Sequence, residues 1–335
     1  MNPFPVDPRD RGPLRADVDA LVAADGRRYP AAAGGYDLRP DGGDANNALQ
    51  AEIYDAKLGE FTHFGTPHNL MLVHQRALLD ALPVGRGDRV LEMGGHRSGA
   101  LAWLEESKGV VGSGVDIAAV WVAAQNAAAD RRGHGTRWYV ADAESLPFPD
   151  EAFGAVVAFD VLEHVTRLDA AVRECARVLR PGGTLVCHLP VQDIGGSFDG
   201  FQRWWDAADY AARQASAGHF NERLPTRLQM RTQLEQAGFD VVAVNSFNVW
   251  LQPLHDHRLM PVLGRLRRTL SRAPKGSAAP PTSPSAPTPP SGPSSFQRAY
   301  ARFAVPFARA ITAPDTIGSL LGVGGSASYV ARKRA

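Results

Sequence analysis

The chain has 335 residues, of which 44% are hydrophobic, and a formal net charge of +1. This length suits one large domain with an appendage, and the near-neutral charge gives no global field that would attract nucleic acid or an anionic membrane. The only cysteines are Cys175 and Cys187, which excludes a disulfide framework and a zinc site built on several thiolates.

Residues 1–45 are rich in Pro, Gly, Asp and Arg, with short β-prone pieces such as Ala20–Val22. We expect this segment to form a small appendage or an arm. The opening MNPFPVDPRD lacks the apolar core of a signal peptide, and the chain has no apolar run of about 20 residues. We therefore expect a cytoplasmic protein without a membrane span.

Helical spacing of apolar residues follows over 46–82, and strands and helices then alternate. The expected helices in the later part are 168–179 and 226–237, and the expected strands are 89–92, 111–115, 137–140, 155–159, 184–188 and 239–245. This alternation predicts an α/β fold: a Rossmann-like, seven-stranded, mostly parallel sheet with helices on both faces. We assign residues 46–250 to this main domain.

Residues 251–325 interrupt the pattern before the chain ends on SASYVARKRA, which we predict to be the last strand of the sheet (326–335). The Pro/Ser/Ala-rich tract 273–294 cannot form a core and is expected to be a disordered linker. The insert begins beside the carboxyl end of a strand, where α/β proteins bind ligands. It is either a cover on the substrate side or a surface excursion without a role.

A glycine-rich turn marks the expected ligand site. The strand Val90–Leu91 leads into Glu92 and then GGHRSG, and a second strand ends at Asp116. Glycines allow close backbone approach, and an acidic residue about 20 positions on can accept both ribose hydroxyls. A carboxylate at the position of Glu92 would repel a pyrophosphate but suits a ligand with an ammonium and a sulfonium, such as S-adenosylmethionine (SAM).

From residue 85 to 190 the chain resembles the class I SAM-dependent methyltransferases, in the small-molecule group called type 11. VLEMGG, GVDIAA, VADAESLPFPDEAF, AVVAFDVLEHV and RVLRPGGTLVCHLP match that family's motifs in order. The resemblance implies a SAM-dependent methyltransferase. It implies cofactor contacts from Glu92, Gly94, Gly95, Gly99, Asp116, Ile117, Asp142, Ala143, Phe159 and Asp160. The first loop departs from the family, because His96, Arg97 and Ser98 stand where Gly-x-Gly is expected.

The N-terminal 45 residues also resemble the small zinc-ribbon segment that precedes some methyltransferases. GPL, DGRRYP and GGYDLRP match its phrases, but Asp7, Asp10 and Ala23 or Ala24 stand near the positions of its cysteines. A ribbon needs about four Cys or His ligands, and the segment has neither residue type. The segment is predicted to be either a degenerate, metal-free ribbon or a disordered arm.

Candidate catalytic residues are Glu163, His164, His188 and His219. Asp160, Glu163 and His164 form a D-x-x-E-H sequence that we expect at the start of a helix, with Asp160 and His164 on one face. With His219 this set resembles the metal site of small-RNA 2′-O-methyltransferases, where a divalent ion binds the acceptor hydroxyls. The alternatives are a metal-free base at His164 and a structural role, and we assign no metal ligand. His188, at the tip of the fifth strand, is either a second base or a satisfied core histidine.

Other aromatic residues are weaker candidates. Trp204, Trp205 and Phe220 either line an apolar acceptor pocket or belong to the core. His63, His68 and His74 fall in the helical segment before the first strand, where Tyr54 or His63 can close over SAM.

The sequence predicts SAM-dependent methylation of a small molecule. We favour O-methylation, in bacterial secondary metabolism, because the Ala/Arg/Pro/Gly-rich composition is typical of high-GC bacteria. An RNA 2′-O-methyltransferase-like enzyme and a non-catalytic partner protein with a SAM fold remain alternatives. Nucleic acid is the less favoured substrate, since only 257–275 and 331–334 are basic. The oligomeric state and the acceptor are not predicted.

Overall fold

A computed structural model describes residues 4–40, 43, 45–55, 64, 67, 69–94, 99–217, 224–255, 302, 306, 310 and 312–335. The expected linker at 273–294 lies outside these residues, as do Gly95, His219, Phe220, His63 and His68.

The main sheet has seven strands in the order β10-β11-β9-β8-β5-β6-β7. Their bounds are β5 Arg89–Met93, β6 Val111–Asp116, β7 Arg137–Val140, β8 Phe153–Phe159, β9 Leu179–Pro190, β10 Phe239–Phe247 and β11 Ser326–Lys333. Only β11 runs antiparallel to its neighbours β9 and β10. This confirms the predicted Rossmann-like fold, with the last strand inserted between β9 and β10.

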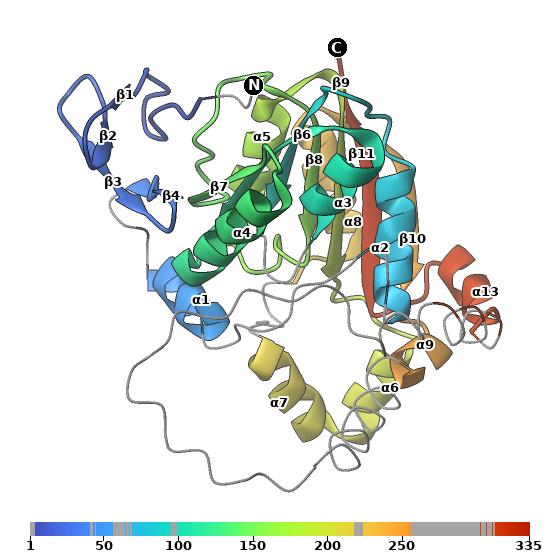
Figure 1. Ribbon diagram of the computed structural model, residues 1–335. Helices are drawn as coiled ribbons and strands as arrows, with labels where there is room; N and C mark the ends of the chain where they lie inside the picture. The colour runs from blue at the N-terminus through green and yellow to red at the C-terminus, as the bar shows by residue number, and fades with distance from the viewer. Residues whose placement is uncertain are drawn as a thin grey trace, which may run out of the picture.

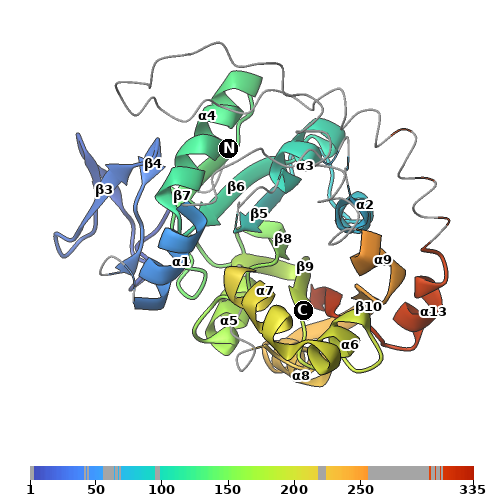
Figure 2. The same cartoon turned by 90° about the horizontal axis from the view of Figure 1, so that it is seen from below.

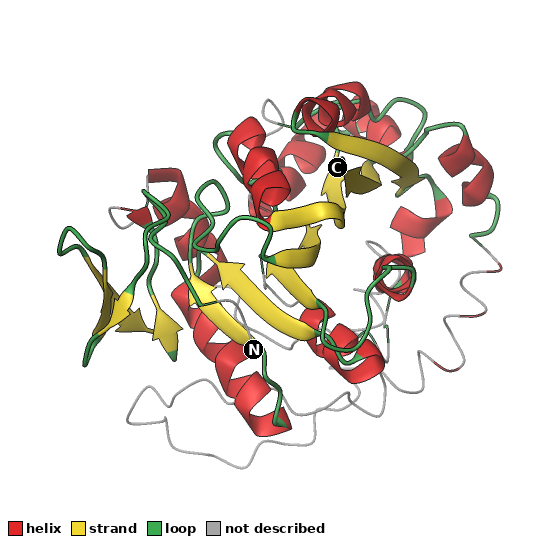
Figure 3. Cartoon of the chain, turned by 90° about the horizontal axis from the view of Figure 1, so that it is seen from above, coloured by secondary structure: helices red, strands yellow, loops and turns green. Residues whose placement is uncertain are grey.

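Helices cover both faces of the twisted sheet (Figures 1 and 3). Their bounds are α1 Ala45–Asp55, α2 Leu70–Asp80, α3 Ala100–Lys108, α4 Ala119–Arg132, α5 Leu168–Val178, α6 Phe198–Trp205, α7 Ala207–Ala217, α8 Arg227–Gln236, α9 Leu251–Pro253 and α13 Asp315–Leu320. All seven residues of β8 are buried, as expected for a central parallel strand covered on both sides. The core lies in two layers, with α2, α3 and α4 packed on one face and α5 and α8 on the other. None of the described helices is long and apolar enough to cross a membrane.

The N-terminal segment is folded. It forms a four-stranded antiparallel sheet of β1 Arg15–Ala16, β2 Ala20–Val22, β3 Arg28–Ala32 and β4 Gly35–Tyr36. Leu38 donates its N–H to the carbonyl of Val140, so the segment continues past the β7 edge of the main sheet. Its buried Leu14, Leu21 and Tyr29 belong to the same core cluster as α5 and β8. The alternative of a disordered arm is therefore wrong for these residues.

An ion-pair network occupies the part of this appendage where the resemblance places metal ligands. The guanidinium of Arg27 contacts carboxylate oxygens of Asp25 at 2.6 Å, Asp10 at 3.0 Å and Asp7 at 3.5 Å. The Asp7 carboxylate also accepts the Tyr29 hydroxyl at 3.0 Å, and Asp7 is fully buried. Burial and this bond raise the pKa of Tyr29 to about 12. The Arg27 guanidinium thus links the loop that carries Asp7 and Asp10 to the loop that carries Asp25.

We expect Asp7→Ala to lower the free energy of unfolding by about 1–3 kcal/mol, because the Tyr29 hydroxyl would lose a buried acceptor. Urea unfolding followed by circular dichroism measures this. Asp10→Ala is the matched control, since the Asp10 side chain is 57% exposed and its loss should change stability little. EDTA should leave both melting curves unchanged; a chelator-sensitive transition would show that the segment holds a metal after all.

Candidate active site

The predicted cofactor residues lie at the carboxyl edge of neighbouring parallel strands, the edge seen from below in Figure 2. Glu92 lies in β5, Asp116 ends β6, and Asp142 follows β7. Glu92 is buried, and its carboxylate accepts the N–H of Leu101 in the first turn of α3 at 3.0 Å. This bond between a carboxylate and a helix N-terminus fixes the start of α3 beside the glycine turn.

Gly94 shows why the turn needs a glycine. Its φ of +73° is in the left-handed region, and an added Cβ would lie 2.2 Å from Cγ2 of Val161. The backbone of the turn therefore lies directly against the segment that follows β8. Gly99 is the residue before α3, with no side-chain cap, and Gly95 lies outside the described residues.

The carboxylates of Asp116 and Asp142, like that of Glu92, accept hydrogen bonds from backbone N–H groups. Asp116 Oδ1 accepts the N–H of Ala118 at 2.8 Å, and Asp142 Oδ1 accepts the N–H of Glu144 at 2.8 Å. Ile117 and Ala143 are the residues between each pair. These short loops fix two carboxylates on the edge of the sheet. Carboxylates of this kind suit ribose hydroxyls and an adenine amino group, so the residues present fit SAM.

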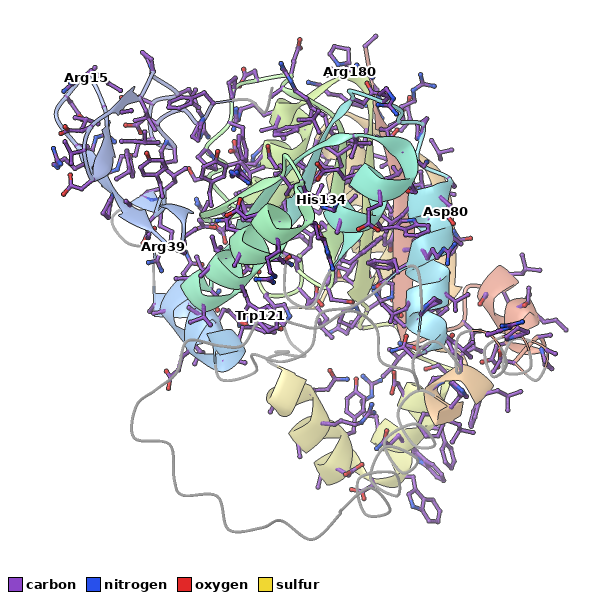
Figure 4. The ribbon with its side chains drawn as sticks, in the orientation of Figure 1. Arg15, Arg39, Asp80, Trp121, His134 and Arg180 are labelled. Carbon is purple, nitrogen blue, oxygen red and sulfur yellow. The ribbon has the colours of Figure 1, made fainter. Side chains whose placement is uncertain are left out.

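Helix α1 packs against this edge through residues that the sequence did not single out. Asn47 donates to Oδ2 of Asp142 at 2.7 Å, and Asn46 donates to the carbonyl of His164 at 2.9 Å. The indole of Trp121, labelled in Figure 4 between α4 and α1, donates to the carbonyl of Tyr54 at 2.9 Å. Polar residues of α1 thus reach two loops of the site, which no local sequence pattern indicates.

The D-x-x-E-H sequence does not start a helix, so that prediction is wrong. Asp160 has a left-handed backbone with φ of +56°, residues 162–164 form a turn, and α5 begins only at Leu168. The helical argument that put Asp160 and His164 on one face therefore fails. His164 instead hydrogen-bonds the Tyr54 hydroxyl through Nε2 at 2.8 Å.

Asp160 pairs with His188. The Nδ1 atom of His188 lies 2.7 Å from Oδ1 of Asp160, and the backbone N–H of Asp160 donates to the carbonyl of His188 at 2.8 Å. Gln75 of α2 donates to the other carboxylate oxygen at 3.2 Å. The Asp160 side chain is 47% exposed, whereas that of His188 is 2% exposed. Phe159, just before Asp160 in β8, is buried.

Both ring nitrogens of His188 are hydrogen-bonded. Its Nε2 lies 2.9 Å from the Ser326 hydroxyl, and that hydroxyl oxygen accepts from the side-chain amide of Asn248. Its Nδ1 lies against the Asp160 carboxylate. His188 is therefore a satisfied buried histidine that orients Asp160, and it is too buried to act on an acceptor directly.

Glu163 is fully buried beneath this edge. Burial and the Asp160 charge raise its pKa well above the usual value, so the neutral acid is favoured. Its Oε1 lies 3.8 Å from Nε2 of His164. A protonated Glu163 is a poor metal ligand, and the described residues contain no group of three or more His, Cys, Asp or Glu able to hold an ion.

The raised pKa predicts a pH-dependent effect of Glu163→Gln. Because the folded state holds this proton more tightly than the unfolded state, the contribution of Glu163 to stability is complete below its unfolded pKa. It is lost as pH rises towards the folded pKa. The free energy of unfolding of wild type relative to Glu163→Gln should thus fall as the pH rises above the ordinary pKa of a glutamate. Parallel stability curves for the two proteins would mean that Glu163 ionises normally.

His74 and the two tryptophans complete the predicted set. His74 of α2 hydrogen-bonds Ser328 at 2.9 Å and stacks on Phe247, and burial lowers its pKa to about 3. It is a neutral buried residue of the helix–sheet interface. Trp204 and Trp205 are largely exposed on α6, so the core role predicted for them is wrong, and the role in an acceptor pocket stays a prediction.

Known proteins with related sequences are methyltransferases. Residues 91–187 match a family model described as a methyltransferase domain. The C-methyltransferase UbiE of ubiquinone/menaquinone biosynthesis from Caulobacter sp. (strain K31) is 32% identical over 129 residues, covering 35% of this chain and 51% of the relative. The mitochondrial 2-methoxy-6-polyprenyl-1,4-benzoquinol methylase of Drosophila melanogaster is 29% identical over 134 residues, covering 35% and 42%. The chain thus spans about half the length of these curated relatives.

Solved structures share the fold. Phosphoethanolamine N-methyltransferase 2 of Haemonchus contortus, in complex with SAM, has a TM-score of 0.52 at 15% identity and covers 78% of this chain and 53% of its own. Geranyl diphosphate C-methyltransferase of Streptomyces coelicolor A3(2) has a TM-score of 0.51 at 14% identity, covering 87% and 99%. These likenesses and the strand order show the Rossmann-like fold of class I methyltransferases, and the family model identifies residues 91–187 as a methyltransferase domain.

Proposed function

We propose that this protein transfers a methyl group from SAM to a hydroxyl oxygen of a small molecule, with Asp160 as the general base. The observation that carries the proposal is the Asp160 carboxylate after β8. It is half-exposed, and it is hydrogen-bonded to the buried His188 side chain. A secondary metabolite is the acceptor class that the composition favours.

Asp160 has the features of a positioned base. Its strained left-handed backbone is of a kind that clusters at active sites, and two side chains and one carbonyl hold it in that conformation. The carboxylate is half-exposed at the edge where ligands bind in this fold. A hydroxyl proton can therefore pass to Asp160, whose carboxylate is held in place by His188.

The residues that we assign to SAM binding lie at the carboxyl ends of β5, β6, β7 and β8. By the family resemblance, Asp116 and Ile117 would hold the ribose, and Asp142 and Ala143 the adenine. Phe159 and Asp160 would lie against the methionine part, beside Glu92 and the glycine turn with Gly94 and Gly99. Bound SAM supplies an activated methyl group on its sulfonium. The chain's part is then to align the acceptor, exclude water and take up a proton.

C-methylation is a second candidate, because the Caulobacter relative is named a C-methyltransferase of ubiquinone/menaquinone biosynthesis and the Drosophila relative a benzoquinol methylase. An electron-rich ring carbon also loses a proton during methylation, and Asp160 is placed to accept it in either reaction. The RNA-enzyme alternative depends on a metal set that includes His219, which lies outside the described residues, so no observation favours it over a small-molecule acceptor.

The test is turnover with ¹³C-methyl SAM against a panel of phenols, catechols and hydroxyquinones, with S-adenosylhomocysteine release as the first readout. Carbon NMR of the product separates a methoxy group from a ring methyl group. A methoxy product supports the proposal, and a ring methyl supports the second candidate. SAM binding with methylation of neither type would overturn the assignment of acceptor class. No SAM binding would favour the non-catalytic partner protein.

A further inference from the structure

The hydrogen bonds of the Asp160–His188 pair continue into the protein interior. The Ser326 hydroxyl at the start of β11 lies 2.9 Å from Nε2 of His188, and the side-chain amide of Asn248 donates to the same hydroxyl oxygen at 3.3 Å. His188, Ser326 and Asn248 are all buried, so their polar atoms must satisfy one another. We call these three residues the buried chain. It reaches the candidate site only through the half-exposed carboxylate of Asp160.

The neighbours of Asn248 fix the orientation of its side-chain amide. The backbone N–H of Asn248 can only donate, so its partner atom on Gln252, at 3.2 Å, must be the oxygen Oε1. The Gln252 nitrogen then faces Oδ1 of Asn248 at 3.4 Å, which leaves the Asn248 nitrogen to donate to Ser326. Asn248 also has a left-handed backbone, with φ of +58°, which asparagine tolerates better than most residues. Its amide is therefore held as a donor to the Ser326 hydroxyl.

Asp315 holds this arrangement from the other end of the predicted insert. Its buried carboxylate accepts the backbone N–H groups of three consecutive residues at 2.9–3.2 Å: Trp250, Leu251 and Gln252. Figures 1 and 2 show α13, which begins at Asp315, beside α9 and beyond the end of β10. The two ends of the insert at 251–325 are thus joined to each other next to the buried chain. A surface excursion without a role does not account for these bonds.

Packing encloses the His188 ring but does not select its orientation. The rings of His74 from α2 and Phe247 from β10 lie edge-on to it, with centroids 6.4 and 6.2 Å away. Such contacts barely distinguish an imidazole from the same ring turned by 180°, in which carbon atoms replace the two nitrogens. Hydrogen bonds make the distinction. The Ser326 hydroxyl at Nε2 favours the orientation in which Nδ1 faces Asp160.

We propose that Ser326 and Asn248 are positioning residues for Asp160, and that the insert supports them through Asp315. The proposal rests on the proposed function, because it takes Asp160 as the base. Ser326 orients the His188 ring, and the ring holds the Asp160 carboxylate at the edge where the acceptor binds. A misplacement of about 1 Å at a reacting group can lower a rate by about 100-fold, so support at this distance from the chemistry has a measurable effect.

Ser326→Ala removes the hydroxyl that joins His188 to Asn248, and Ser328→Ala is the matched control. Ser328 lies two residues further along β11 and is also buried, and its hydroxyl also lies 2.9 Å from a histidine Nε2, that of His74. We expect Ser326→Ala to lower kcat by about tenfold, with less than about a twofold change in the KM of the acceptor and the Kd for SAM. Ser328→Ala should lower the melting temperature by a similar amount and keep the wild-type kcat. Equal losses of kcat in the two variants would overturn the positioning role.

A double variant shows whether Ser326 acts through Asp160. In the Asp160→Asn background, Ser326→Ala should cause no further loss of kcat, because the group that it positions can no longer accept a proton. The same loss in both backgrounds would refute the positioning role and leave Asp160 as the base. An unchanged kcat in Asp160→Asn alone would instead refute the base, and the positioning role with it.

The ¹⁵N NMR signals of the imidazole rings give a readout that needs no acceptor. Asn248→Gly tolerates the left-handed backbone and removes the amide, so the ring-nitrogen resonances of His188 should shift while those of His74 stay as in wild type. Asp315→Asn, which leaves one side-chain oxygen for three N–H donors, should shift the His188 resonances in the same direction. The backbone amide spectrum shows that each variant is folded. Unshifted His188 resonances in both folded variants would show that the insert does not support the pair and would overturn the proposal.

Discussion

Asp160→Asn should lower kcat by about 100-fold or more, the usual size of a general-base contribution. Asparagine is isosteric with aspartate and tolerates the left-handed backbone at φ +56°, so the fold and the bond to His188 can persist, while the Gln75 amide must turn its oxygen toward the new NH2 group. What the variant removes is the ability to accept a proton. Stopped turnover assays, with S-adenosylhomocysteine as the product measured, give kcat and KM for the acceptor.

SAM affinity distinguishes this role from the cofactor contact that the resemblance assigns to Asp160. As a base, Asp160 can be replaced by Asn with a change in Kd for SAM of less than about threefold, measured by calorimetry. If the Kd rises strongly while kcat is unchanged, Asp160 holds the cofactor and is not the base. Gln75→Met should lower kcat less than Asp160→Asn does, since it removes one donor to Asp160 and leaves His188 in place.

His188→Asn tests the positioning role of the buried imidazole. We expect a smaller loss of kcat than in Asp160→Asn, and a shift of the pH–rate profile, because the environment of the carboxylate changes. A purely structural histidine would lower the melting temperature and leave the pH profile of the remaining activity unchanged.

The main fold could be predicted because its signals are local and strong. Apolar runs such as 155–159 match β8, and the SASYVARKRA segment matches β11, whose antiparallel insertion follows from the family order. Boundaries were less accurate: β9 runs from Leu179 to Pro190, whereas 184–188 was expected. Leu179 pairs with Phe153, and the pairing with β8 then shifts register and resumes at Thr184, so the glycine turn at 182–183 interrupts the ladder but not the strand.

The candidate site was predicted only in part, for a physical reason. Glu92, Asp116 and Asp142 were found because the carboxyl ends of parallel strands meet at one edge. Asn46, Asn47 and Gln75 come from α1 and α2, far away in sequence, and a polar residue on a helix carries no sign of where its side chain will reach. The spacing of the D-x-x-E-H sequence indicated a helix, but the left-handed Asp160 bends the chain before one can start.

Asp116→Ala should raise the Kd for SAM by about 10- to 150-fold, the equivalent of about 1.5–3 kcal/mol for hydrogen bonds to a charged acceptor. The Asp116 side chain is buried at the end of β6, and one oxygen accepts the N–H of Ala118, the N-cap residue of α4. The carboxylate is therefore rigid and oriented before the ribose arrives, so little ordering entropy opposes binding. Calorimetry with SAM and with S-adenosylhomocysteine should show the same loss, because both carry the ribose.

Two further variants separate binding from folding. Asp116→Asn keeps an oxygen for the Ala118 N–H, so its melting temperature should stay near that of wild type while its affinity for SAM still falls. Asp130→Ala removes an exposed carboxylate near the other end of α4, paired only with Arg137 among the described residues, and should leave affinity unchanged. Wild-type affinity in both Asp116 variants would mean that the ribose is bound elsewhere, and the assignment of the whole carboxyl edge to SAM would fail with it.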